Sequence, residues 1–253
     1  MDACFKAFWL PKDGCSEEEY EDAFFPRNSA SLTGQQFRFA VADGATEASF
    51  SRLWARMLVR AFVRRTLRMP LTVDQLASLR EQWAAVIHGR TLPWYAEEKA
   101  ASGAFSSLLG LELSENRESE RSQRTWRATA VGDSCLAQIS GDKVICAFPL
   151  TKASAFNNRP SLLGSLASTP VDEPDLILEV TGEWAREDQF LLMTDALACW
   201  FLRECEDGSK PWALLREACA HGQKSFRRFV ADLRHQRALK NDDVTLMRID
   251  ILE

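Results

Sequence analysis

A strand followed at once by a long amphipathic helix, within residues 37–65, places the strongest constraint on how this chain folds. Apolar residues alternate with others over residues 37–42, a pattern typical of a β-strand. The pair Asp43-Gly44 then predicts a turn. Over residues 50–62, apolar side chains recur at spacings of three and four, as on the buried face of a helix. Asp43 therefore either serves the turn or is a carboxylate held rigidly between two packed elements, as metal binding or catalysis requires.

The composition is that of a globular protein. The residues are 46% apolar and 26% charged, which is ordinary for a globular protein. The length of 253 residues is enough for one large domain or two small ones. No apolar run approaches the roughly 20 residues of a membrane span, and the first residues do not resemble a signal peptide, so we expect no membrane association. Seven cysteines without CxxC spacing indicate reduced thiols in a cytoplasmic protein. The net charge of −5 argues against nucleic acid as the main partner.

The remaining sequence predicts strands and helices without an obvious linker, so residues 1–253 are expected to form a single domain. Strands are predicted at 3–9, 105–113, 125–131, 135–139, 143–148, 176–180, 190–193 and 244–252. Those between 105 and 148 are expected to form one antiparallel meander. Helices are predicted at 72–86 with Thr72 as N-cap, from Pro93, after Asp195, and over 211–239. Loops are predicted at 27–35 and 114–123, and a long mobile flap is predicted at 151–175, near the acidic site described below.

Four acidic residues recur at the ends of predicted strands: Asp22, Asp43, Asp195 and Asp242. A single acid of this kind is usually part of a solvated loop. Four brought together repel one another strongly unless a cation neutralises them. Oxygen ligands suit Mg²⁺ or Mn²⁺ rather than zinc. The pattern therefore favours a site for hard divalent ions.

Five short segments, in this order, resemble the motifs of the PP2C (PPM-type) metal-dependent protein phosphatases. They are EDAF at 21–24, VADG at 41–44, VGDS at 131–134, LMTD at 192–195 and DDVT at 242–245. The resemblance covers nearly the whole chain. It implies an α+β fold, a four-layer α-β-β-α sandwich of two antiparallel sheets flanked by helices.

The resemblance also implies metal ligands. Asp43 would bridge two ions of Mg²⁺ or Mn²⁺, and the carbonyl of Gly44 would contact the second ion. Asp195 and Asp242 would complete the shell of the first ion. With Asp22, these three aspartates would form the catalytic set.

Two further acidic positions follow from the same resemblance. Glu21 and Asp22 would act on the second ion and on its waters, and Asp133 matches an acid that helps to hold a third, looser ion. The implied reaction is attack of an ion-activated water on phosphoserine or phosphothreonine in a protein substrate, opposite a Ser/Thr kinase. The alternative is a binding or regulatory module with the same fold and little turnover.

The sequence departs from the family pattern at several positions. Glu17 stands where the family has an arginine or lysine that holds phosphate, so the phosphate-binding residue is unknown. Ala45 replaces a histidine found in some members. Ala196 and Cys199 replace the glycine and second aspartate of the fourth motif, so we expect a weak third ion at best. Asp243 stands where asparagine is usual.

Overall fold

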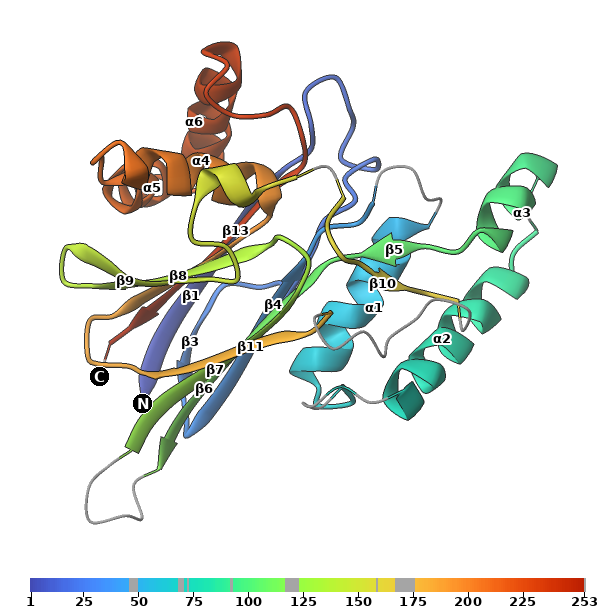
Figure 1. The fold of residues 1–253 in the computed structure, drawn as a ribbon, viewed down its shortest axis with the longest axis horizontal. Helices are drawn as coiled ribbons and strands as arrows, with labels where there is room; N and C mark the ends of the chain where they lie inside the picture. Colours follow the sequence, from blue (N-terminus) through green and yellow to red (C-terminus); the bar gives the residue numbers. More distant parts are fainter. Residues whose placement is uncertain are drawn as a thin grey trace.

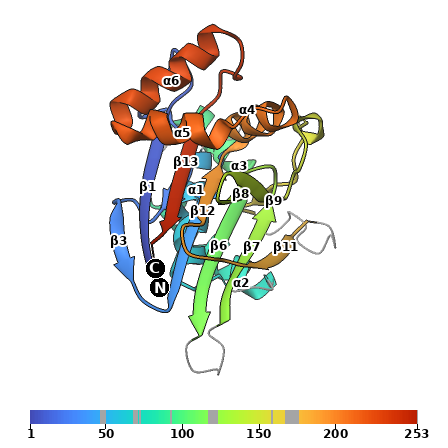
Figure 2. The same cartoon turned by 90° about the vertical axis from the view of Figure 1, so that its left-hand side faces the viewer.

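The computed structural model describes residues 1–45, 50–67, 71, 73–91, 93–116, 123–157, 159–166 and 176–252. Within them, two antiparallel sheets pack face to face (Figures 1 and 2). The first sheet has the order β3 (Ala30–Thr33), β1 (Asp2–Leu10), β13 (Val244–Ile251), β12 (Gln189–Met193), β8 (Cys135–Ser140) and β9 (Lys143–Phe148). The second has the order β11 (Leu178–Glu183), β7 (Gln123–Val131), β6 (Leu108–Asn116), β4 (Gln36–Ala42) and β2 (Ala23–Phe25).

Helices cover the outer face of each sheet (Figure 1). The second sheet carries α1 (Ser51–Val63), with α2 (Val73–His88) and α3 (Trp94–Ala101) beyond it. The first sheet carries α4 (Asp195–Glu206), α5 (Pro211–Ala220) and α6 (Gln223–His235). A short pair, β5 (Phe105–Ser106) and β10 (Leu163–Gly164), and a 3-10 turn, η1 (Ala153–Ala155), complete the described elements. The predicted four-layer α-β-β-α sandwich is confirmed.

Three apolar layers hold the four structural layers together, and β4 shows how one strand serves two of them. Phe39 and Val41 pack between the sheets, whereas Ala40 and Ala42 pack under α1. Successive side chains of a strand point to opposite faces, so the part of a strand that is covered on both sides must be apolar, as residues 39–42 of β4 are. Burial of a side chain such as Phe39 contributes roughly 1.5–3 kcal/mol. Because β4 is packed on both faces, the position of the residue that follows it is well defined.

The strands between residues 105 and 148 do not form one meander, and this prediction was wrong. The pair β6–β7 belongs to the second sheet, and the pair β8–β9 belongs to the first. The chain crosses between the sheets at Gly132, Asp133 and Ser134. Gly132 has a φ of +96°, and a Cβ there would lie 2.7 Å from the Cβ of Ser107. Alternation predicts strands but not the sheet that each one joins, so the crossing could not be predicted.

Other boundaries differ in smaller ways. The predicted loop 27–35 contains the edge strand β3, and the predicted helix 211–239 is two helices, α5 and α6, separated at Gly222 with a φ of +82°. The pairing of β6 with β7 up to Asn116 and Gln123 confirms the hairpin around 114–123. The predicted N-cap Thr72 lies outside the described residues, as do positions 117–122 of the hairpin loop.

The segment 151–175 is partly built into the core. Leu163 is buried, and its carbonyl accepts a hydrogen bond of 2.8 Å from Nε1 of the buried Trp54 in α1. The predicted flap is therefore wrong for this part of the segment, whereas residues 158 and 167–175 lie outside the described residues. No helix in the described ranges is both long and apolar enough to cross a lipid bilayer.

Candidate functional site

The predicted aspartates come from both sheets and meet at one end of the sandwich. Asp22 directly precedes β2 and Asp43 follows β4, both in the second sheet. Asp195 follows β12 and Asp242 precedes β13, both in the first sheet. Asp133 lies in the crossing between the sheets. The negative charges of neighbouring aspartates help to raise the pKa values of Asp22, Asp43, Asp133 and Asp195, so these acids form one electrostatic cluster.

Asp22 is fully buried and held by hydroxyl groups. Its Oδ2 accepts hydrogen bonds from Thr194 Oγ1 at 2.9 Å and Thr245 Oγ1 at 2.7 Å, and the hydroxyl of Tyr20 bonds to Thr245 Oγ1. Its Oδ1 has no hydrogen-bond partner among the described residues. Burial, and then the charge of Asp243, raise the pKa of Asp22 well above its usual value. A buried carboxylate oxygen without a partner is costly, so this oxygen suits a positively charged ligand.

Asp43 is fixed through its backbone. Its N–H donates to Ser107 Oγ at 2.9 Å, and its carbonyl accepts from Ser107 N at 2.9 Å and from Ser106 Oγ at 2.8 Å. The residue keeps some exposed surface, but burial of the carboxyl, followed by the charges of Asp22 and Asp195, raises its pKa well above the usual value. The serines thus hold Asp43 against the repulsion of its neighbours.

Gly44 and Glu21 lie against each other at the border of the cluster. Gly44 pairs with Ser106, and a Cβ on Gly44 would lie 2.8 Å from the carbonyl oxygen of Glu21, so a larger residue does not fit here. Oε1 of Glu21 accepts a 2.7 Å hydrogen bond from Ser51 Oγ, and its Oε2 lies 3.9 Å from Lys12 Nζ. The structure therefore places the Glu21 carboxylate with Ser51 and Lys12, beside the aspartates.

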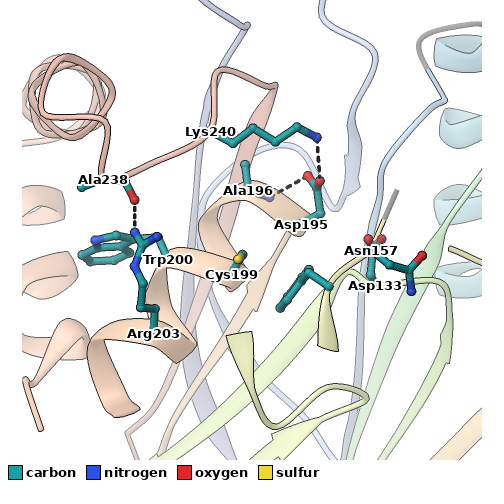
Figure 3. Close-up of a pocket in the computed structure, with 10 residues that line it drawn as sticks. Asp133, Asn157, Asp195, Ala196, Cys199, Trp200, Arg203, Ala238 and Lys240 are labelled. Atoms are coloured by element: carbon teal, nitrogen blue, oxygen red, sulfur yellow. Dashed lines mark hydrogen bonds and ion pairs between the residues drawn. The ribbon is translucent and has the colours of Figure 1, made fainter. Parts of the chain in front are cut away.

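Asp195 and Asp242 share a lysine that the sequence analysis did not single out. Nζ of Lys240 lies 2.7 Å from Asp242 Oδ2 and 3.6 Å from Asp195 Oδ2; Figure 3 shows the side chain reaching toward Asp195. Burial, and then the charge of Asp242, raise the pKa of Asp195, while Lys240 opposes the rise. Burial works against the charge of Lys240, but the hydrogen bond to Asp242 and the attraction of both acids outweigh it and raise its pKa.

Asp243 has a structural task that the sequence did not indicate. It is buried, and its Oδ1 and Oδ2 accept hydrogen bonds from the backbone N–H groups of Lys12 at 2.8 Å and Glu21 at 2.6 Å. These bonds tie the loop before β13 to the segment that carries Glu21 and Asp22. The partners lie 231 and 222 positions away in the sequence, so no local pattern could reveal them.

A cavity of about 160 Å³ opens beside the aspartates (Figure 3); its wall includes Asp133, Asp195, Lys240, Cys199, Arg203 and Asn157. Burial, and then the charge of Asp195, raise the pKa of Asp133 to about 6. Cys199 is partly exposed on α4, and burial raises the pKa of its thiol. The cysteine that replaces the expected acid therefore faces the same cavity as Asp133, rather than the core.

Glu17 stands where the family has an arginine or lysine that holds phosphate, and the structure shows it in an ion pair. Its carboxylate accepts a hydrogen bond from Arg227 of α6, and its side chain is 58% exposed. Ion pairs with the acids of the site come instead from Lys12 and Lys240.

The acidic side chains of the site do not converge on one position as metal ligands do. Within the described residues, no three His, Cys, Asp or Glu side chains are arranged as a group that could hold a metal ion as they stand. The chemistry of the donors nevertheless fits Mg²⁺ or Mn²⁺, because all are carboxylate or carbonyl oxygens. The oxygen of Asp22 without a partner and the clustered negative charge point the same way. Lys240 occupies the position between two of the expected ligands.

Solved phosphatase structures share this fold. The serine/threonine phosphatase PstP/Ppp of Mycobacterium tuberculosis is 13% identical, with a TM-score of 0.60 over 100% of both chains. A PstP catalytic domain in complex with two manganese ions is 13% identical, with a TM-score of 0.56 over 99% of this chain and 100% of that one. The phosphatase domain of SpoIIE from Bacillus subtilis is 13% identical, with a TM-score of 0.52 over 99% and 92%. No protein-family model and no curated protein sequence matches the chain.

These similarities confirm the resemblance at the level of the fold: the chain has the fold of the PP2C-type phosphatases. The identities are too low to carry residue roles from one protein to the other. The roles of the acidic residues therefore remain predictions that depend on the geometry described above.

Proposed function

We propose that residues 1–253 form one PP2C-type domain that hydrolyses phosphoserine and phosphothreonine in proteins, opposite a Ser/Thr kinase, with Mg²⁺ or Mn²⁺ as cofactor. The observation that carries the proposal is the meeting of Asp22, Asp43, Asp195 and Asp242 at one end of a fold shared with phosphatases. Gathering carboxylates that are buried or half-buried destabilises a protein, so their presence favours a cationic ligand.

The proposed ligands divide between the two sheets. Asp43 would bridge two ions with the Gly44 carbonyl on the second, Asp195 and Asp242 would hold the first, and Glu21 and Asp22 would serve the second. When bound, such ions lower the pKa of water and neutralise phosphoryl oxygens. Asp133 would contribute to a weak third site.

The residues around these ligands would orient them. Thr194 and Thr245 fix Oδ2 of Asp22, which leaves its Oδ1 for an ion. Ser107 fixes the backbone of Asp43 on both sides, and Asp243 holds the segment that carries Asp22. The polar contacts of this surrounding shell set ligand positions before any ion arrives, which is how outer contacts support metal sites.

A second candidate is a binding or regulatory module with this fold and little turnover. Two observations favour it: Glu17 is paired with Arg227 where a phosphate-holding cation is expected, and Lys240 stands between two proposed ligands. Such a module would keep the fold and bind phosphoproteins without hydrolysing them.

Hydrolysis of p-nitrophenyl phosphate and of a phosphothreonine peptide, with Mn²⁺ and with EDTA, separates the two candidates. The phosphatase proposal expects turnover that EDTA removes and that Asp43→Asn abolishes. Asp207→Asn is the matched control, because this exposed acid at the end of α4 lies outside the site. Absence of Mn²⁺-dependent turnover in the folded wild-type protein would favour the binding module.

A further inference from the structure

The two acids that Lys240 contacts each have one oxygen engaged by the backbone and one left over. Oδ1 of Asp195 accepts a hydrogen bond from Ala196 N at 2.6 Å, and Oδ1 of Asp242 accepts one from Asp243 N at 3.0 Å. Lys240 contacts the other oxygen, Oδ2, in both cases. The ammonium therefore occupies the two carboxylate oxygens that the backbone leaves available to a cation.

We propose that Lys240 is a tethered cation that a divalent ion must displace from Asp195 and Asp242, so that this side chain sets the metal affinity of the site. The inference rests on the proposed function, because it takes these two aspartates as metal ligands. An ammonium and a divalent ion on the same oxygens repel each other strongly, since neither is screened by water between them. The lysine and the ion therefore compete for the pair.

The structure allows the side chain to leave while its backbone stays in place. The loop around Lys240 is held by Arg203, which donates to the carbonyl of Ala238, and by Arg234, which donates to the carbonyl of Asp242 at 2.5 Å. Asn241 Oδ1 accepts a 2.6 Å hydrogen bond from the backbone N–H of Asp13. None of these bonds uses the Lys240 side chain, which is 63% exposed.

An exposed ammonium on a flexible stem can swing into water, where it regains its hydration, and the free-energy cost of leaving is then the lost attraction to the two carboxylates. Displacement therefore requires neither loop opening nor strand separation. The same contact would stabilise the folded protein without ions, because the positive charge of Lys240 offsets the repulsion between the carboxylates of Asp195 and Asp242.

The test compares Lys240→Met with Lys210→Met by calorimetric titration of chelator-stripped protein with Mn²⁺. Lys210 is the matched control: it is an exposed lysine paired with Asp142, outside the site, and its loss changes the net charge equally. We expect Lys240→Met to bind Mn²⁺ at least about tenfold more tightly than wild type, the scale on which residues around ligands affect metal sites. Lys210→Met should match wild type, and Lys240→Arg should restore weaker binding. In EDTA, Lys240→Met should melt at a lower temperature than Lys210→Met.

The outcomes separate this inference from the proposed function. If wild type binds Mn²⁺ and Lys240→Met binds it with equal or lower affinity, the tethered cation is wrong and the metal site stands. If neither protein binds Mn²⁺ while both remain folded by circular dichroism, the proposed metal site and the inference are both overturned.

Discussion

The two sheets hold their acids in different ways. On the second sheet, Asp22 is buried and receives two hydroxyl donors, and no Lys or Arg in the described residues forms an ion pair with it or with Asp43. On the first sheet, Asp195 and Asp242 have side chains 17% and 25% exposed and share the ammonium of Lys240.

This difference shows that one cluster can combine two kinds of electrostatic state. The Asp22 carboxylate depends on neutral hydroxyl donors, which relieve a buried charge only in part, and the serines at Asp43 contact its backbone; the pKa values of both acids rise well above normal. The first-sheet acids carry a counterion of their own. The second sheet should therefore gain the most from an added cation, whereas the first sheet should resist it.

The largest expected effect comes from removing one proposed metal ligand from either sheet. Asp43→Asn and Asp195→Asn should each lower Mn²⁺-dependent turnover by at least about a hundredfold, because loss of a ligand should exceed the 10–100-fold cost of losing a supporting contact. Turnover on p-nitrophenyl phosphate and calorimetric Mn²⁺ affinity measure this, with Asp207→Asn as control. Unchanged Mn²⁺ affinity in both variants would contradict the proposed site.

The next effect concerns the neutral donors of the second sheet. Thr245→Val removes a hydroxyl that donates to Asp22 and also takes the partner of the Tyr20 hydroxyl. Loss of this donor leaves a buried polar oxygen less satisfied and should lower the free energy of unfolding by about 1–3 kcal/mol in urea titrations. Thr245→Ser keeps the hydroxyl and is the control. Equal stability of the valine and serine variants would show that this hydroxyl does not support the carboxylate.

The pH dependence of the ion-free protein should report the second-sheet acids. The folded pKa values of Asp22 and Asp43 are raised, so the native state holds protons that the unfolded chain has released. Their contribution to stability therefore falls as pH rises above the unfolded value near 4, by up to about 1.4 kcal/mol per pH unit for each proton.

Urea titrations in EDTA at several pH values measure this slope, and Asp22→Asn should flatten it relative to wild type. Asp207→Asn should leave it unchanged. A slope that is the same in wild type and Asp22→Asn would mean that the hydroxyl donors already keep Asp22 ionised without cost.

The smallest effect concerns the third ion. Cys199→Asp adds an acid to the cavity that contains Asp133 and should lower the Mn²⁺ concentration needed for full activity severalfold, because a carboxylate is a better ligand for Mn²⁺ than a thiol. Cys205→Asp, on the same helix α4 but outside that cavity, is the control. A full third ion bound through Asp133 in unmodified protein, seen in a crystal with Mn²⁺, would show that Cys199 does not limit this site.

The fold could be predicted from the resemblance of five short segments to a phosphatase family, and the aspartates could be placed near strand ends from local patterns. Asp43 directly follows β4, and Asp195 lies two residues beyond β12 at the first position of α4, so their placement near a strand end is visible in the sequence. The order of the five motif segments then indicated how these ends meet.

The contacts that distinguish the two pairs of acids could not be predicted. Lys240 lies two residues before Asp242 in a polar stretch, and nothing local indicates that its side chain turns back to reach Asp195. In the sequence, Asp243 stands out only as a departure from a pattern, and its hydrogen bonds with Lys12 and Glu21 depend on how the two sheets pack. Such contacts follow from tertiary structure, which side-chain periodicity does not encode.

The hydrogen bond from Thr245 to Asp22 joins residues 223 positions apart. Contacts between such distant residues form late in folding, because the entropy of closing a long loop is lost before the contact stabilises anything. During synthesis on the ribosome, Asp22 and Asp43 emerge long before Thr245 and Lys240. In a nascent chain these two carboxylates are still hydrated and apart, and affinity for ions should appear only once residues 242–245 have joined the sheet.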